Sequence, residues 1–161
     1  MKIYTKEEID RARDYLESEG FQKIEAELED VSFVYYEVPQ SLNEELPDFV
    51  MRMTGSSPDD GKLYGISKSV RKELRPYAVA HEVIEFGHLG IDHPDRCIFA
   101  LDRELAIVPL NMFNEYVDMR MRFFERLIPY AKSNPEHYDS DDVRQFEANY
   151  RKLRDLATRD Q

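Results

Sequence analysis

The 161-residue sequence has a single cysteine, Cys97, and no long apolar run. One cysteine excludes an intrachain disulfide and is typical of a reducing compartment. No stretch is apolar for long enough to span a bilayer, and the first residues lack the hydrophobic segment of a signal peptide. The sequence therefore predicts a cytoplasmic protein without a membrane partner.

Basic residues are also scarce relative to acidic ones. The 22 lysines and arginines stand against 33 aspartates and glutamates, which gives a formal net charge of −11. This balance, with no basic stripe, argues against a phosphate-binding surface, so nucleic acid is not expected as a partner. The length fits one domain over residues 1–161, with a helix and a small sheet in 1–75 and helices in 76–161.

The N-terminal half predicts one helix followed by strands. Thr5 to Glu8 has the form of a capping box, and helical spacing of apolar residues continues to Gly20. Residues 21–28 fit a helix or a strand. β-branched and aromatic residues predict a strand over 31–38. Two further strands are expected at 49–53 and 62–67, paired through the turn-rich loop between them.

The C-terminal half predicts mainly helices. One helix runs from Pro76 to the glycines at 87 and 90, and a short apolar segment follows at 96–108. A long amphipathic helix covers 111–131, and Ser140 is expected to cap the last helix. The predicted fold class is therefore α+β: a small sheet of three to four strands in the N-terminal half, a metal-type helix, then a helical C-terminal half.

Three of the four histidines lie between residues 80 and 93, interleaved with acidic residues. On a helix, His81 and Glu85 are four residues apart and share a face, and His88 lies two turns from His81 on the same side. Glu82 is one residue round from His81. Two ligands at i and i+4 with a carboxylate beside the first are typical of a catalytic metal helix.

Ala80-His81-Glu82, preceded by the strand at 62–67, resembles the centre of a small zincin metallopeptidase of the gluzincin type. The zincin motif is His-Glu-x-x-His, and here Glu85 stands at its last position. The resemblance covers roughly residues 62–122. It implies that the strand before the helix is an edge strand that holds an extended peptide substrate. It also implies that Glu82 is the general base acting on a metal-bound water.

The resemblance further implies a ligand set of His81, Glu85 and a glutamate from a later helix. Glu115, in Asn114-Glu115-Tyr116-Val117-Asp118, is similar to that third ligand, although the spacing to Asp118 differs by one residue. His88, His93 and Glu104 are alternatives for the same position. Zinc is the expected ion. Two carboxylates would make the ion a weaker Lewis acid and would favour manganese or iron instead.

Each site residue also has a structural interpretation. His81 fits a hydrogen-bonded pair in the core. Glu82 fits a carboxylate on the helix face that pairs with Lys72 or Arg75. His88 fits a helix C-terminal cap, where it would face the negative end of the helix dipole. Glu115 fits a solvated helix face. Tyr77, Tyr116 and Tyr130 are candidates for stabilising an oxyanion, and the sequence does not choose among them.

The leading functional prediction is a metal-dependent hydrolase that cleaves a peptide or protein substrate. One alternative is a zincin fold that has lost catalysis and serves as a binding or regulatory module. Another is a di-iron helical protein, for which Glu85 and His88 supply one Glu-x-x-His motif. Such proteins use two of these motifs from separate helices, and the sequence has one.

Overall fold

The computed structural model describes residues 1–159 and shows a mixed α+β fold. A four-stranded sheet lies in the N-terminal half and helices make up the C-terminal half, so the predicted fold class is confirmed at this level. The strands are β1 (Gln22–Leu28), β2 (Val31–Val38), β3 (Val50–Thr54) and β4 (Lys62–Ser67). The helices are α1 (Lys6–Ser18), α2 (Arg75–Val83), α3 (Arg96–Ile107), α4 (Leu110–Lys132) and α5 (Ser140–Arg159).

The strand order in the sheet is β1-β2-β4-β3. β1 and β2 are antiparallel, β2 and β4 parallel, and β4 and β3 antiparallel. The expectation that the strand before the metal-type helix is an edge strand is therefore wrong, because β4 has a neighbour on each side. Its residues from Leu63 to Ser67 are all buried, as a central strand requires. The edge strand beside β4 is β3.

The segment that fitted either a helix or a strand is the strand β1. Gly20 adopts a left-handed conformation (φ 74°) after α1, which redirects the chain. β1 then pairs with β2 along its whole length, from Gln22 opposite Glu37 to Leu28 opposite Val31. Pairing with a neighbouring strand decided between the two patterns, because sequence periodicity alone fitted both.

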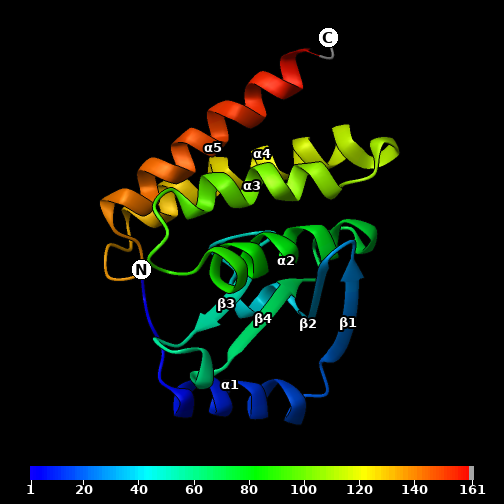
Figure 1. Cartoon of the computed structure of the whole chain (residues 1–161). Coiled ribbons are helices and arrows are strands. Elements are labelled where there is room, and N and C mark those ends of the chain that lie inside the picture. Colours follow the sequence, from blue (N-terminus) through cyan, green and yellow to red (C-terminus); the bar gives the residue numbers. More distant parts are fainter. Residues whose placement is uncertain (160–161) are drawn as a thin grey trace.

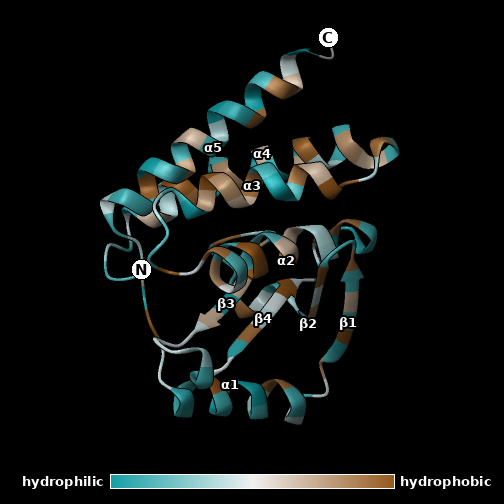
Figure 2. Cartoon of the chain, viewed as in Figure 1, coloured by the Kyte–Doolittle hydropathy of each residue, from teal (hydrophilic) through white to brown (hydrophobic). Residues whose placement is uncertain are grey.

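The elements are stacked in layers (Figure 1). α1 covers one face of the sheet and α2 the other, and α3, α4 and α5 lie on the far side of α2. α2 is therefore enclosed between the sheet and the C-terminal helices. This position explains why it is buried on nearly every side, including at His81. The outermost helices, α1 and α5, are largely hydrophilic (Figure 2).

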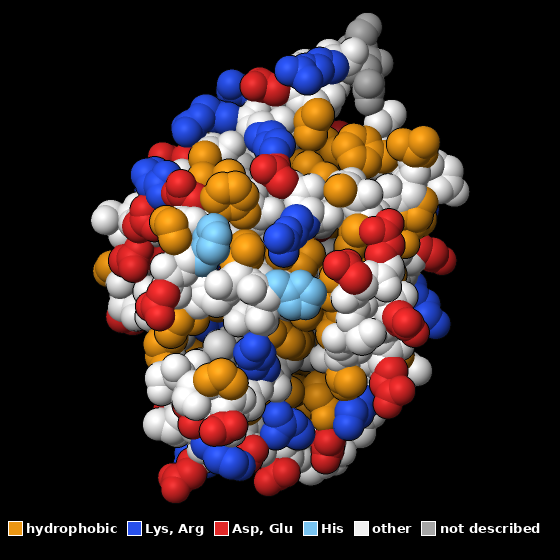
Figure 3. All heavy atoms as spheres, viewed as in Figure 1, with side chains coloured by type: hydrophobic (Ala, Val, Ile, Leu, Met, Phe, Trp, Pro, Cys, Tyr) orange, Lys and Arg blue, Asp and Glu red, His pale blue; other side chains and the backbone are white. Residues whose placement is uncertain are grey.

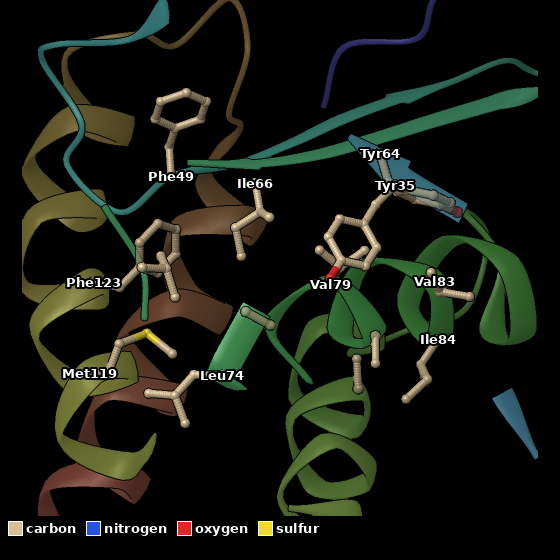
Figure 4. Close-up of a cluster of buried hydrophobic side chains, with 14 of the residues drawn as sticks. Tyr35, Phe49, Tyr64, Ile66, Leu74, Val79, Val83, Ile84, Met119 and Phe123 are labelled. Atoms are coloured by element: carbon tan, nitrogen blue, oxygen red, sulfur yellow. The ribbon is translucent and has the colours of Figure 1, made fainter. Parts of the chain in front are cut away.

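The hydrophobic core fills the space around α2. Figure 4 shows side chains from the sheet, α2 and α4 directed toward one another. The labelled residues are Tyr35, Phe49, Tyr64, Ile66, Leu74, Val79, Val83, Ile84, Met119 and Phe123. Any polar side chain that α2 directs toward α3 or α4 is consequently removed from water, and such groups must be paired or bind a ligand.

The ends of several helices test the capping predictions. The capping box of Thr5 and Glu8 is present at α1. α2 continues into a π-helical segment, Ile84–Leu89, that ends at Gly90 (φ 89°), within the predicted range. Ser140 is not the cap of α5, because it is the first helical residue. The preceding Asp139 accepts hydrogen bonds from the backbone N–H groups of residues 141 and 142 instead.

No helix among residues 1–159 combines the length and the apolar character needed to cross a membrane. On the face shown in Figure 3, lysine and arginine side chains are interspersed with acidic ones, and apolar side chains lie between them.

Candidate metal centre

The centre of the site is the imidazole of His81, whose exposed fraction is 2%. Its Nδ1 lies 2.6 Å from Oε2 of Glu104 on α3. Its Nε2 lies 3.2 Å from Oε2 of Glu85 and 3.4 Å from Sγ of Cys97. One ring nitrogen therefore faces a carboxylate that orients the ring, and the other faces two further groups able to bind a metal.

Glu104 is fully buried and holds three partners. Besides His81, it accepts a short hydrogen bond from the hydroxyl of Tyr116 and pairs with Nε of Arg120 at 2.8 Å. Both partners come from α4, one turn apart, and both are buried. The charge of the Glu104 carboxylate is thus compensated by the Arg120 guanidinium. The contact of Glu104 with Nδ1 fixes the orientation of the His81 ring.

Glu85 lies in the π-helical segment and is 5% exposed. Its Oε2 faces His81, and its Oε1 lies 3.2 Å from Nε of Arg96. Arg96 in turn contacts Oδ1 of Asp142 at 2.8 Å through Nη2. The guanidinium therefore holds one oxygen of Glu85 and leaves the other directed at the imidazole.

Cys97 lies in the first turn of α3 and is 3% exposed. Two buried residues of α5 fix it. The N–H of Cys97 donates to Oε1 of Gln145 at 2.8 Å. Nδ2 of Asn149 lies 3.1 Å from the carbonyl oxygen of Cys97 and 3.3 Å from its sulfur. Cys97 is consequently held in place by α5.

His81, Glu85 and Cys97 each offer one ligand atom, and the three atoms lie within 4.8 Å of one another. Around a tetrahedral zinc ion, adjacent nitrogen, oxygen and sulfur ligands are about 3.3 to 3.6 Å apart, given the usual metal–ligand lengths. The observed separations of 3.2 and 3.4 Å from His81 Nε2 are close to these values. The third pair, Glu85 and Cys97, lies within 4.8 Å, so the three side chains could hold a divalent metal.

A cavity of about 110 Å³ adjoins the three side chains. Glu82, Arg52 and Phe86 also line it, together with aromatic residues of α4 and α5. The Glu82 side chain makes no hydrogen bond or ion pair within residues 1–159, in contrast to the carboxylates of Glu85 and Glu104. The cavity thus contains a free carboxylate one residue from His81.

Burial and neighbouring charges shift the pKa values of these groups. Burial, together with the Glu85 charge, raises the pKa of Glu82 to about 7. Burial likewise raises the pKa of the Cys97 thiol to about 12, with Glu85 adding to it. Burial opposes ionisation of Glu104, but Arg120 and His81 outweigh it and lower the Glu104 pKa. Burial also disfavours a charged His81, yet Glu104 and Cys97 hold its pKa well above the usual value.

Two residues predicted as ligands lie apart from this group. Glu115 is 47% exposed and pairs with Arg71 at 2.8 Å. The helix direction explains this, since α4 turns Tyr116 and Arg120 toward Glu104 and so directs Glu115 to the surface. His88 is exposed near the end of the π-helical segment. The structure therefore does not bring Glu115 or His88 to His81.

The alternatives for the third ligand also differ from expectation. His93 donates from Nδ1 to the carbonyl of Pro94 at 2.6 Å and packs its ring against Phe99. Glu104 does reach His81, but at Nδ1, where it orients the ring. The third ligand-type side chain is Cys97, which was expected only to indicate a reducing compartment. The sequence shows that a cysteine, a soft metal ligand, is present at position 97. It does not show that this cysteine lies close to His81.

No protein-family model, curated protein or solved structure matches the chain. The resemblance to zincin metallopeptidases therefore stays a prediction.

Proposed function

We propose that the chain is a metal-dependent hydrolase whose metal ligands are His81, Glu85 and Cys97 and whose general base is Glu82. The observation that supports this most directly is the convergence of an imidazole nitrogen, a carboxylate oxygen and a sulfur within 4.8 Å. A divalent cation bound there would polarise a substrate carbonyl and lower the pKa of a coordinated water.

The surroundings of the three ligands favour a metal over a purely structural cluster. Metal-binding side chains are usually oriented by outer partners. Each ligand here has one: Glu104 at His81, Arg96 at Glu85, and Asn149 at Cys97. At His81 and Glu85 the partner contacts a different atom from the one that faces the other two ligands, whereas Asn149 donates to the Cys97 sulfur itself. A core pair of His81 and Glu104 alone would not account for Glu85 and Cys97 both facing Nε2 of His81.

The charges support the same proposal. Arg96 is shared between Glu85 and Asp142, and Arg120 is paired with Glu104. A divalent cation would balance the charges of Glu85 and of a deprotonated Cys97, whose pKa the neighbouring Glu85 otherwise raises. A thiolate in the set also favours zinc over manganese, because soft sulfur ligands select zinc.

The position of Glu82 supports its proposed role as the base. It lines the cavity beside the ligands and has no competing partner in residues 1–159. A carboxylate in this position would accept a proton from the attacking water and deliver it to the leaving amine. The substrate would enter through the cavity and bring its peptide or amide bond to Glu82. Tyr116 is excluded as an oxyanion donor, because its hydroxyl donates to Glu104.

Metal content tests the ligand set. We expect about one zinc per chain by plasma mass spectrometry, and a loss of zinc in His81→Ala and Cys97→Ala. Matched controls are His88→Ala and Glu115→Ala, which remove surface residues that the sequence alone placed in the site, and both should keep the metal. Cobalt-substituted wild-type protein should show thiolate-to-cobalt charge-transfer absorption, which requires no variant. Its absence, with cobalt bound, would exclude Cys97 as a ligand.

Hydrolysis tests the base. The zinc-loaded protein is incubated with a peptide mixture and the products are followed by mass spectrometry. Glu82→Gln should retain zinc and lose activity by at least about a hundredfold, as expected for general base catalysis. Zinc binding without cleavage of any peptide would instead favour the non-catalytic module.

The second candidate function is that of a cysteine hydrolase. Cys97, His81 and Glu104 are arranged as the nucleophile, the base and the orienting carboxylate of a triad. The raised pKa of the thiol opposes it. The N–H of Cys97 is also bonded to Gln145 and does not face an oxyanion. Activity that withstands a chelator but is abolished by iodoacetamide would favour the triad and contradict the metal proposal.

A further inference from the structure

We infer that Arg52, on the edge strand β3, binds a carboxylate of the substrate, so that the hydrolase acts on a small amide bearing a carboxylate group. The part of this inference that concerns hydrolysis of the amide rests on the proposed function. For binding, the inference depends only on the cavity and on Arg52. Binding measured with and without a metal therefore distinguishes failure of the one from failure of the other.

Three arginines line the cavity, and they differ in their partners. Arg96 pairs with Glu85 and Asp142, and Arg120 pairs with Glu104. Arg52 has no carboxylate within ion-pair distance among residues 1–159. Its one hydrogen bond runs from Nη1 to the backbone carbonyl of Lys2 at 3.2 Å. A guanidinium has five N–H donors, so most of the fork is free for an acceptor.

The sheet register fixes where Arg52 lies. In the β3–β4 pair, Arg52 is opposite Tyr64, which places both side chains on the face of the sheet that packs against α2. The guanidinium carbon lies 4.1 Å from the centre of the Phe86 ring. Stacking on an aromatic ring holds the planar fork without using its N–H groups. Arg52 is thus a positioned cation in the wall of the cavity.

Arg52 also marks the mouth of the cavity. A second, outer hollow of about 270 Å³ is lined by Leu46, Val50, Arg52, His137 and Tyr138, and all five residues also line the inner cavity. A molecule that enters from the outer hollow therefore passes Arg52 before it reaches Glu82. Its carboxylate would bind at the mouth, while its amide bond would lie deeper, beside His81.

The size of the inner cavity limits the substrate. Its volume is about 110 Å³. It is smaller than a typical pocket for a drug-sized ligand, roughly 300 to 1,000 Å³. The carboxylate-bearing amide is accordingly short: an N-acyl amino acid, or the C-terminal end of a small peptide. Both present the same chemistry to Arg52 and Glu82.

Two probes that differ only in charge test this inference. N-Acetylglycine carries a carboxylate, whereas N-acetylglycinamide carries a neutral amide of the same shape. Binding to the full chain is measured by NMR titration, first with a chelator and then with one equivalent of zinc. We expect the metal-free protein to bind N-acetylglycine about ten to a hundred times more tightly, which is the usual effect of a hydrogen-bonded charge pair.

Variants assign the effect to Arg52. Arg52→Gln should abolish the preference for the carboxylate, and Arg52→Lys, which keeps the charge without the fork, should retain part of it. Arg126→Gln is the matched control on the surface and should leave the preference for the carboxylate unchanged. NMR spectra of each variant establish that it is folded. Equal binding of the two probes, no binding of either, or a preference that survives in Arg52→Gln would overturn the inference.

The source of the substrate is distinguished with N-acetylglycine and an acetylated tripeptide as alternative ligands. Tighter binding of the tripeptide indicates a peptide C-terminus, and tighter binding of N-acetylglycine indicates an N-acyl amino acid. A preference that appears only with zinc and persists in Arg52→Gln would mean that the carboxylate binds the metal, which contradicts the inference. If the chain binds no zinc while Arg52 still discriminates the probes, the hydrolase proposal fails and the carboxylate site stands.

Discussion

Replacing Glu104 with glutamine tests the buried network that holds His81. The substitution keeps the size of the side chain but removes its charge. Arg120, which is 2% exposed, would then be a buried guanidinium without its carboxylate partner. Breaking a buried ion pair by removing one partner costs about 3 to 5 kcal/mol. This is a large part of the roughly 5 to 15 kcal/mol by which domains are stable.

The loss is measured by urea unfolding of the metal-free protein. With an m-value of about 2 kcal/mol/M, Glu104→Gln should lower the unfolding midpoint by about 1.5 to 2.5 M. Metal affinity should also fall, by about ten to a hundredfold, because Glu104 orients the His81 ring. The control is Glu115→Gln, which removes an exposed carboxylate paired with Arg71 and should change stability by no more than about 1 kcal/mol.

A double substitution separates the ion pair from other effects. Arg120→Met alone leaves Glu104 uncompensated, whereas Glu104→Gln with Arg120→Met removes both charges. We expect the double variant to be more stable than the sum of the two single losses predicts, by about 1 to 3 kcal/mol. Additive losses, or a loss below about 1 kcal/mol for Glu104→Gln, would refute the argument that a buried charge pair stabilises this site.

Four further substitutions test the fold and are measured by urea unfolding. In Gly55→Ala the new Cβ overlaps the Cβ of Asp60, which lies next to the backbone, so we expect a loss of about 1 to 3 kcal/mol. In Gly65→Ala the one close contact of the new Cβ is with the terminal methyl group of Met51, which can move aside, so a smaller loss should result; equal losses would contradict this argument. Thr5→Ala removes the capping box of α1 and should cost about 1 kcal/mol, and an unchanged midpoint would show that the cap is dispensable. Leu101→Ala should cost about 2 to 5 kcal/mol because Leu101 is fully buried in α3, and a loss below about 1 kcal/mol would mean that the core refills the space.

Local features of the fold were predictable because they depend on neighbours in sequence. The strand over Val31–Val38 and the capping box at Thr5 were both predicted correctly. The segment 22–28 was not decided by its pattern, since it fits a helix and a strand equally well. Hydrogen bonds to β2 decided it, and these join residues that a sequence pattern does not pair.

The site was likewise predictable only where it depends on residues close together in sequence. His81, Glu82 and Glu85 lie on one helix and its continuation, so the spacing of four residues was enough to place His81 and Glu85 together. Glu115 was assigned to the site on a motif resemblance, and that choice depended on the rotation of α4. The observed rotation directs Tyr116 and Arg120 inward and Glu115 outward, and only packing against α3 fixes it.

The sequence by itself determined the α+β class, the helix that holds His81 and Glu85, and the excess of acidic residues. These follow from periodicity, spacing and composition, which are properties of the chain before it folds. Tertiary structure alone decided that Cys97 faces His81, that Glu104 orients the imidazole, and that Arg52 reaches the cavity. Each of these contacts joins separate elements, and the docking of α3, α4 and β3 around α2 brings them together.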